Sequence, residues 1–242
     1  MIAMPSLERK SIAPQRYVPP FETGDRMDQK TFHELYLTTP KGFKAELIGG
    51  AVHMASPVSI RHGRPHRAIT AWLHEYTQAT EGTEWYSDVT VIMSNETEPQ
   101  PDLSLLIYPE AGGQTTENDR GFLVGAPELA IEVAVSSASI DLNAKKRDYE
   151  KYGVVEYLVV VVKAKLVHWF VRGKKGFVDM TPDSDGLLNS RVFPGLWLDP
   201  TGVFDRTPKK LLVALKLGLA STEHAKFRAK LQKKLDKPRK TS

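Results

Sequence analysis

The sequence predicts a mixed α/β domain, of the α+β kind, built around one principal sheet flanked by helices. Residues 129–135 are apolar on both faces except for Glu132, a pattern typical of a strand in the middle of a sheet. Strand-like runs alternate with segments of helical period along most of the chain. The 242 residues, 41% of them hydrophobic, are enough to bury one large core.

The first half of the chain predicts a short helix, a hairpin, a long helix and two further strands. Gly49 and Gly50 separate the two strands of the hairpin. Residues 109–127 carry Gly112-Gly113 and a polar run, which predicts a loop. Helices are expected at 28–37 and 62–79, and strands at 46–48, 51–54, 89–93 and 103–108.

The second half predicts a helix, a pair of strands and a helical end. Gly153 is expected to end a helix that spans residues 141–152. Short strands and loops are expected up to residue 205, after the strands at 154–162 and 166–171. Helical spacing runs from residue 208 to about residue 235, with a break expected near Ser221.

Three parts follow from this pattern: a loose arm at residues 1–24, the main domain at 25–205 and a basic helical extension at 206–242. Residues 223–242 hold eight Lys or Arg and two acids, a net charge of +6, which leaves −2 on residues 1–222. Such a tail can contact nucleic acid or can be a solvated helix end.

The tail also carries an apolar stripe that consists of Phe227, Leu231 and Leu235. This stripe can dock on the body or on a second subunit, so a homodimer stays open.

Composition excludes several classes of site. The chain contains no cysteine, so disulfides, thiolate nucleophiles and cysteine-type zinc sites are absent. The first twenty residues lack the apolar run of a secretory signal, and the apolar run at 154–162 is too short to span a bilayer. We therefore expect a cytoplasmic protein with no membrane partner.

Two carboxylates stand in or directly before expected strands. Burial of Glu132 in its apolar run is costly unless a cation or hydrogen bonds compensate, although an arginine partner or a wet cavity would also explain it. Asp102 follows Pro101 at the head of an earlier strand, where an aspartate usually caps its own turn. Each acid alone therefore has an ordinary structural explanation.

Lys145 is the third candidate. On its expected helix it shares a face with Leu142 and Tyr149, so it points inward with the apolar stripe, whereas Lys146 is expected to face solvent. An inward lysine usually has a carboxylate partner, although its stem can also extend along the edge of the stripe to water.

Two acids and an inward lysine are the groups that metal-assisted phosphodiester hydrolysis requires. Oxygen ligands suit Mg²⁺, which keeps several of its waters. The metal polarises the phosphoryl oxygen and lowers the pKa of a bound water. A nearby lysine can orient that water or neutralise the charge that develops on the phosphate.

Several short motifs follow one another along the chain, among them Glu46-Leu47-Ile48-Gly49-Gly50, Pro99-Gln100-Pro101-Asp102, Ile131-Glu132-Val133-Ala134 and Gly153-Val154-Val155-Glu156-Tyr157. In their order these motifs resemble the Uma-two family of restriction-endonuclease-like proteins, which belongs to the PD-(D/E)XK nuclease superfamily. The resemblance implies a restriction-endonuclease-like core with elements in the order αβββαβ and a C-terminal helical tail. It also implies a Mg²⁺-dependent endonuclease that cleaves DNA, with Mn²⁺ able to substitute.

The resemblance implies a role for each matching residue. Asp102 stands for the PD half of the motif and Glu132 for its second acid, and these two are the expected metal ligands. Glu46 matches the acid near the start of the nuclease core. The chain departs from the superfamily at Ala134, where a lysine is usual, and Lys145 matches a lysine that has moved to the next helix.

Two further residues are expected to contact the substrate. His62 matches a family position and can contact the phosphate, and Gln100 can reach the site from the start of its strand. His62 and His66 lie four residues apart on one helix face, but without the flanking glutamate of a zincin motif this is a weak metal signal.

Two other functions remain compatible with these residues. The fold could be kept without strong catalysis, as a nucleic-acid-binding module, although the intact set of Glu46, Asp102, Glu132 and Lys145 argues against this. A two-carboxylate glycoside hydrolase is the other, but that chemistry does not need an inward lysine.

Overall fold

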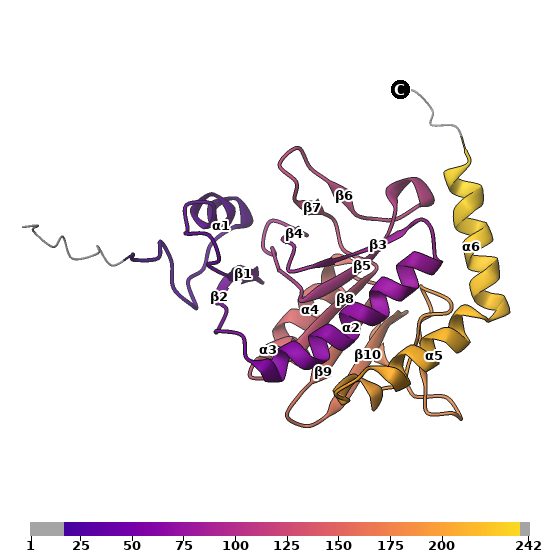
Figure 1. Cartoon of the computed structure of the whole chain (residues 1–242). Helices are drawn as coiled ribbons and strands as arrows, with labels where there is room; N and C mark the ends of the chain where they lie inside the picture. The colour runs from indigo at the N-terminus through magenta and orange to yellow at the C-terminus, as the bar shows by residue number, and fades with distance from the viewer. Residues whose placement is uncertain (1–16, 238–242) are drawn as a thin grey trace, which may run out of the picture.

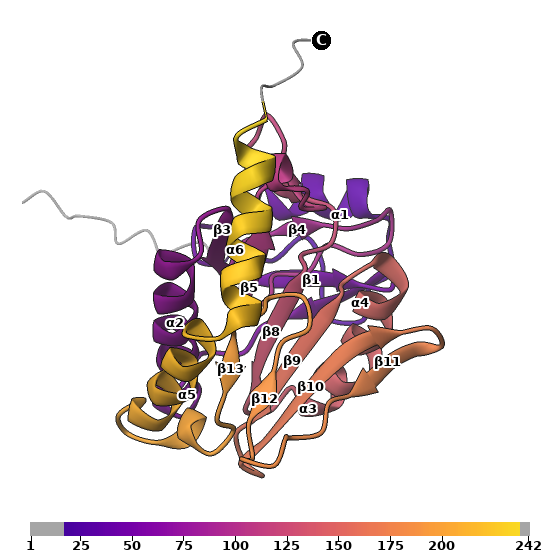
Figure 2. The same ribbon diagram turned by 90° about the vertical axis from the view of Figure 1, so that its right-hand side faces the viewer.

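Six strands form one mixed sheet: β3 (Thr83–Ser87), β5 (Leu103–Ile107), β8 (Leu129–Ala134), β9 (Glu156–Val161), β10 (Leu166–Gly173) and β11 (Gly176–Asp179). Their order is β11-β10-β9-β8-β5-β3 in the computed structural model, which describes residues 17–237 (Figures 1 and 2). The central strands β8 and β9 are parallel, and the other neighbouring pairs are antiparallel.

The parallel pair needs a crossover connection, which a helical run supplies. This run consists of α3 (Ala138–Ile140), the π-helix η2 (Asp141–Lys145) and α4 (Lys146–Tyr152), and it ends at Gly153 in the left-handed region. The long helix α2 (Ile60–Ala79) and α5 (Lys209–Leu219) cover the opposite face of the sheet (Figure 1). The order α2, β3, β5, β8, crossover helix, β9 confirms the predicted αβββαβ core.

Side chains of β8 alternate between the two faces, as a pleated strand requires. Leu129, Ile131 and Val133 pack into the core beneath α2. Ala130 and Ala134 pack beneath the crossover helix instead. Glu132 lies between these two alanines in the alternation, so the strand directs its carboxylate toward the crossover helix.

A hairpin outside the main sheet carries Glu46. It consists of β1 (Ala45–Ile48) and β2 (Ala51–Met54), with α1 (Gln29–Tyr36) packed against it. Gly49 and Gly50 have φ values of 56° and 74°, which favour glycine in this tight turn. The Asp148 carboxylate of the crossover helix accepts a 2.6 Å hydrogen bond from the Gly49 N–H and fixes the hairpin to the domain.

Several segments differ from the sequence prediction. The expected loop at 109–127 contains a 3-10 turn and two short strands, and the strand expected at 89–93 is reduced to two residues. The edge strand β3 was not predicted. Two-residue strands are too short to produce a periodic signal, and tertiary pairing alone defines them. These elements are η1 (Pro109–Ala111), β4 (Val91–Ile92), β6 (Thr116–Glu117) and β7 (Leu123–Val124).

The C-terminal segments pack on the domain. β12 (Leu188–Asn189), β13 (Trp197–Leu198) and η3 (Gly202–Phe204) precede α5, and α6 (Thr222–Leu235) follows it. The break near Ser221 is confirmed, because its hydroxyl caps α6 by accepting from the His224 N–H at 3.2 Å. Leu231 is buried and Phe227 packs against the core, so the apolar stripe docks on the body, at the end of the molecule opposite the β1–β2 hairpin (Figure 1).

Both ends of the chain extend beyond the residues that the structure describes. Residues 1–16 of the expected arm, and the last five residues of the expected extension, lie outside the described residues. The three-part division therefore stays a prediction. Within residues 17–237, no helix is both long and apolar enough to cross a membrane.

Close packing of α5 leads to a prediction about stability. A Cβ on Gly218 would lie 2.2 Å from the Gly195 carbonyl oxygen. Gly218→Ala should therefore lower the free energy of unfolding by about 1–3 kcal/mol, although glycine-to-alanine changes usually favour a helix. Gly63→Ala in α2 is the matched control, because its Cβ would meet nothing within 4 Å. Urea unfolding should show the control unchanged or stabilised, and a stabilised Gly218→Ala would contradict the packing argument.

Candidate active site

The Lys145 ammonium joins two carboxylates from separate elements. Its Nζ donates to Glu132 Oε1 at 2.9 Å and to Glu46 Oε1 at 2.8 Å. Tyr149, one helical turn further on, donates its hydroxyl to the same Glu132 oxygen at 3.0 Å. Lys145 and Glu132 are only 3% and 5% exposed, so the contacts are shielded from water. The predicted inward position of Lys145 is confirmed.

The π-helix sets the position of this lysine. Segments of this kind are rare and occur frequently at functional sites. Here η2 contains both Asp141 and Lys145, and both side chains are buried on the side facing β8. Lys146 follows directly, and the prediction that it faces solvent was wrong. Its Nζ lies 3.8 Å from the centroid of the Phe170 ring, because the flexible stem folds over that aromatic face.

Gln100 contributes its backbone rather than its side chain. Its N–H donates to Glu46 Oε1 at 2.6 Å and thereby holds the hairpin glutamate beside Lys145. Its side-chain amide donates to the Tyr36 hydroxyl and to Thr90 Oγ1, both at 2.8 Å. Gln100 lines the cavity, but these two bonds anchor its amide to α1 and to the loop before β4.

Asp102 is oriented from two sides. Its Oδ2 accepts from the Val133 N–H at 2.7 Å, and its Oδ1 accepts from His62 Nε2 at 3.1 Å. Burial alone would raise the pKa of Asp102, but His62 and this N–H hold that pKa below its usual value. The same hydrogen bond raises the pKa of His62. The His66 ring stacks on His62, with centroids 5.5 Å apart.

Asp141 belongs to the same site but was not predicted. It is 3% exposed, lines the cavity and accepts from the Ser137 hydroxyl at 2.6 Å. Burial raises its pKa to about 6, against the lowering effect of Lys145. The sequence could have identified Asp141 by its position four residues before Lys145 on one helix, since this spacing places the two side chains next to each other on one face.

The charges of the site do not balance. Four carboxylates, on Glu46, Asp102, Glu132 and Asp141, lie around the ammonium of Lys145, and His62 pairs with one of them, Asp102. Burial and the neighbouring acids raise the pKa of Glu132, and the ammonium opposes that shift. Burial would lower the pKa of Lys145, but the surrounding carboxylates outweigh it and keep the amine charged. The excess of negative charge favours a cation.

These residues open into a cavity of about 440 Å³. All six residues named from the sequence reach it or border it: Glu46, His62, Gln100, Asp102, Glu132 and Lys145. Among residues 17–237, no three His, Asp or Glu side chains form a group able to hold a metal ion together. Mg²⁺ commonly uses one or two carboxylates and keeps its waters, so Asp102 and Glu132 fit it by donor chemistry.

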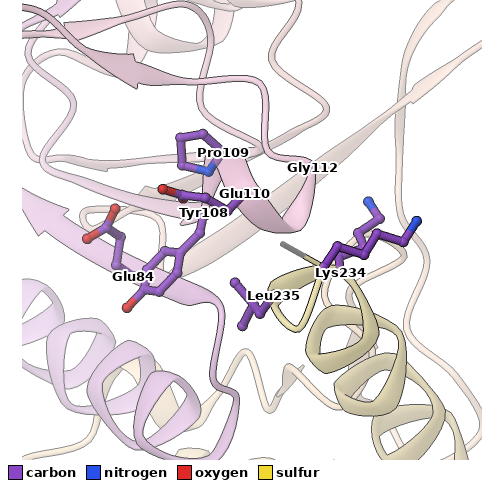
Figure 3. A pocket seen from close by; sticks show the side chains of 8 residues that line it. Glu84, Tyr108, Pro109, Glu110, Gly112, Lys234 and Leu235 are labelled. Atoms are coloured by element: carbon purple, nitrogen blue, oxygen red, sulfur yellow. The ribbon is translucent and has the colours of Figure 1, made fainter. Parts of the chain in front are cut away.

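A second, larger cavity lies away from these acids. It has a volume of about 750 Å³ and lies between η1, β3 and the end of α6, as Figure 3 shows. Lys234 donates from Nζ to the Ala111 carbonyl at 2.7 Å, so this lysine fastens α6 to η1. None of the residues named from the sequence lines it. We therefore place the candidate site in the smaller cavity.

Comparisons with known proteins agree with the arrangement of the core. The model of the Uma2 family, described as putative restriction endonuclease, matches residues 30–201. The chain belongs to this family. No curated protein matches. A solved structure from Anabaena variabilis ATCC 29413, described as a putative nuclease belonging to DUF820, covers 75% of this chain and 97% of its own at 12% identity, with a TM-score of 0.52. At that identity the likeness shows the fold alone, and it confirms the predicted fold class.

The raised pKa of Asp141 allows a test of the site by thermal stability alone, without a measurement of enzymatic activity. The folded protein holds this proton more tightly than the unfolded chain, so stability falls as pH rises from about 3.8 through about 6. Asp141→Asn should therefore raise the melting temperature at pH values well above 6, in metal-free buffer, by a few degrees. The gain should shrink toward zero at pH values near 4.

The control for this experiment is Asp119→Asn, since Asp119 is exposed. Differential scanning fluorimetry across the pH range measures all three proteins. A parent that is more stable than Asp141→Asn at high pH would contradict the assignment of a destabilising buried charge.

Proposed function

We propose that this Uma2-family protein is a Mg²⁺-dependent endodeoxyribonuclease of the PD-(D/E)XK type. The observation that carries the proposal is the Lys145 ammonium, which bonds to Glu46 and Glu132 inside the cavity that Asp102 also lines. A structural ion pair would need only one carboxylate for one ammonium. An excess of buried acids facing a cavity fits a site that binds a cation.

Each residue of the chain has a distinct task in this proposal. Asp102 and Glu132 would hold Mg²⁺, which when bound would polarise the phosphoryl oxygen and acidify a water. The Lys145 ammonium would orient the attacking water and neutralise charge that develops on the phosphate. Glu46 holds Lys145 in place, and the Val133 N–H and His62 keep Asp102 ionised and correctly oriented.

The alternative is a nucleic-acid-binding module that has lost strong catalysis. Lys145 already donates hydrogen bonds to two glutamates, and this arrangement would also fit a purely structural network. The buried Asp141 favours the nuclease, because an additional acid destabilises a site that holds no cation. A cytoplasmic location, DNA rather than RNA as substrate, and a homodimer are further parts of the proposal.

Metal binding should be visible as stabilisation. Mg²⁺ or Mn²⁺ at millimolar concentration should raise the melting temperature by mass action, because the ion relieves repulsion among the carboxylates. Asp102→Asn should abolish the rise, and Glu81→Gln, a change at an exposed acid outside the cavity, should retain it. If neither ion changes the melting temperature of the parent protein, the proposed metal site is wrong.

The role of Lys145 predicts the rates of three variants. Lys145→Met keeps the stem but removes the charge, and it should slow the chemical step by roughly a hundredfold to a thousandfold. Lys145→Arg should not restore the rate, because a planar guanidinium does not replace a compact ammonium. Arg147→Ala is the control, since Arg147 is exposed on the same helix.

Single-turnover cleavage of DNA with Mn²⁺ would measure these rates, with melting temperatures recorded to show that each variant folds. Lys145→Met that cleaves at the parental rate would show that the chemistry does not use this lysine. A larger loss in Arg147→Ala would lead to the same conclusion.

A further inference from the structure

The mouth of the candidate site is unusually apolar for an exposed surface. Among residues 17–237, twelve large hydrophobic side chains are exposed; three of them line this one cavity, and a fourth, Ile60, directly follows the lining residue Ser59. We call these four residues the rim: Met54, Val58, Ile60 and Ile140. Val58 and Ile60 are 66% and 72% exposed, and burying such side chains on a ligand would be favourable.

The rim comes from two walls of the cavity. Met54 ends β2, Val58 lies on the segment between β2 and α2, and both line the cavity. Ile60 begins α2 directly after the lining residue Ser59. Ile140, at the end of α3, lines the cavity from the crossover side. The acids and Lys145 lie deeper, so an occupant that reaches them passes between apolar side chains.

Charge near the rim suits a polyanion. The first turns of α2 carry Arg61 and Arg64, both exposed, and the first turn contains no acid. A cavity of about 440 Å³ falls in the range of sites that hold a whole small molecule, so it has room beyond a phosphate group. Apolar rim side chains at the mouth, with charged side chains deeper in the cavity, therefore match a nucleotide, because the faces of its base are flat and apolar.

A paired duplex does not offer those faces. Its bases are stacked, and the surface beside each phosphate is sugar and phosphate. Apolar side chains near DNA contribute binding energy where a base step is opened or a base is unstacked, as wedges or platforms. We propose that the rim binds an unstacked nucleotide next to the phosphate that is cleaved, so the preferred substrate is single-stranded or locally unpaired nucleic acid.

This inference rests on the proposed nuclease function and names its substrate class. The test uses a short fluorescein-labelled single strand of mixed sequence, and the same strand in a blunt duplex, with Lys145→Met protein and Mn²⁺ to prevent rapid cleavage. Fluorescence anisotropy should show tighter binding of the single strand. Adding Val58→Ser and Ile60→Ser should weaken single-strand binding roughly tenfold and leave duplex binding unchanged.

The matched control carries Leu166→Ser and Val178→Ser on β10 and β11. These side chains are 53% and 57% exposed and do not line the cavity, so both affinities should stay at the starting level. A preference for the duplex, an equal loss on both substrates, or an equal loss in the control would overturn the proposal. So would rim variants that bind both substrates normally, since the rim would then serve another partner.

Cleavage separates this inference from the proposed function. Suppose that the parent protein cuts the interior of a blunt duplex as fast as the single strand, at a rate that the rim changes do not alter. It is then still a nuclease, but it does not use an unstacked nucleotide. Protein that cuts neither substrate with Mg²⁺ or Mn²⁺, yet binds the single strand through the rim, keeps the binding site and loses the proposed activity.

Discussion

The buried ammonium of Lys145 is the contact on which the rest of the site depends. A buried charge is tolerated only when partners compensate for lost hydration, and here the partners come from the β1–β2 hairpin and from the central strand β8. The crossover helix supplies the lysine itself. One ion pair network therefore joins three parts of the chain that are distant in sequence, and it also leaves an excess of negative charge in the cavity.

Sheet topology explains why the acids meet at this place. The antiparallel register pairs Leu103 of β5 with Ile131 of β8, so Asp102, just before β5, lies beside Glu132 and Val133. The parallel partner of β8 requires a crossover, and the crossover helix passes over the same end of β8. The candidate catalytic residues therefore lie where β5, the antiparallel neighbour of β8, begins and where the crossover connection from β8 to β9 starts.

Other buried glutamates show what is special about Glu132. Glu156 is fully buried, yet backbone N–H groups of Arg191 and Val192 and the Ser190 hydroxyl satisfy it. Such an acid fastens a loop to the sheet, and its hydrogen bonds stay inside the core. Glu132 instead lines the cavity beside its partner Lys145, and so its carboxylate is available to a ligand.

The sequence by itself determined the central strands of the main sheet, the two long helical regions and Glu132, Asp102 and Lys145 as candidate site residues, because hydrophobic period and local charge are properties of neighbouring positions. It did not determine β3, the small β4-β7-β6 sheet, the π-helix or Asp141. Those depend on pairing between distant segments, which no local pattern encodes. Only the tertiary structure decided that Glu46 reaches Lys145 from a hairpin outside the sheet, because that contact depends on how separate elements pack.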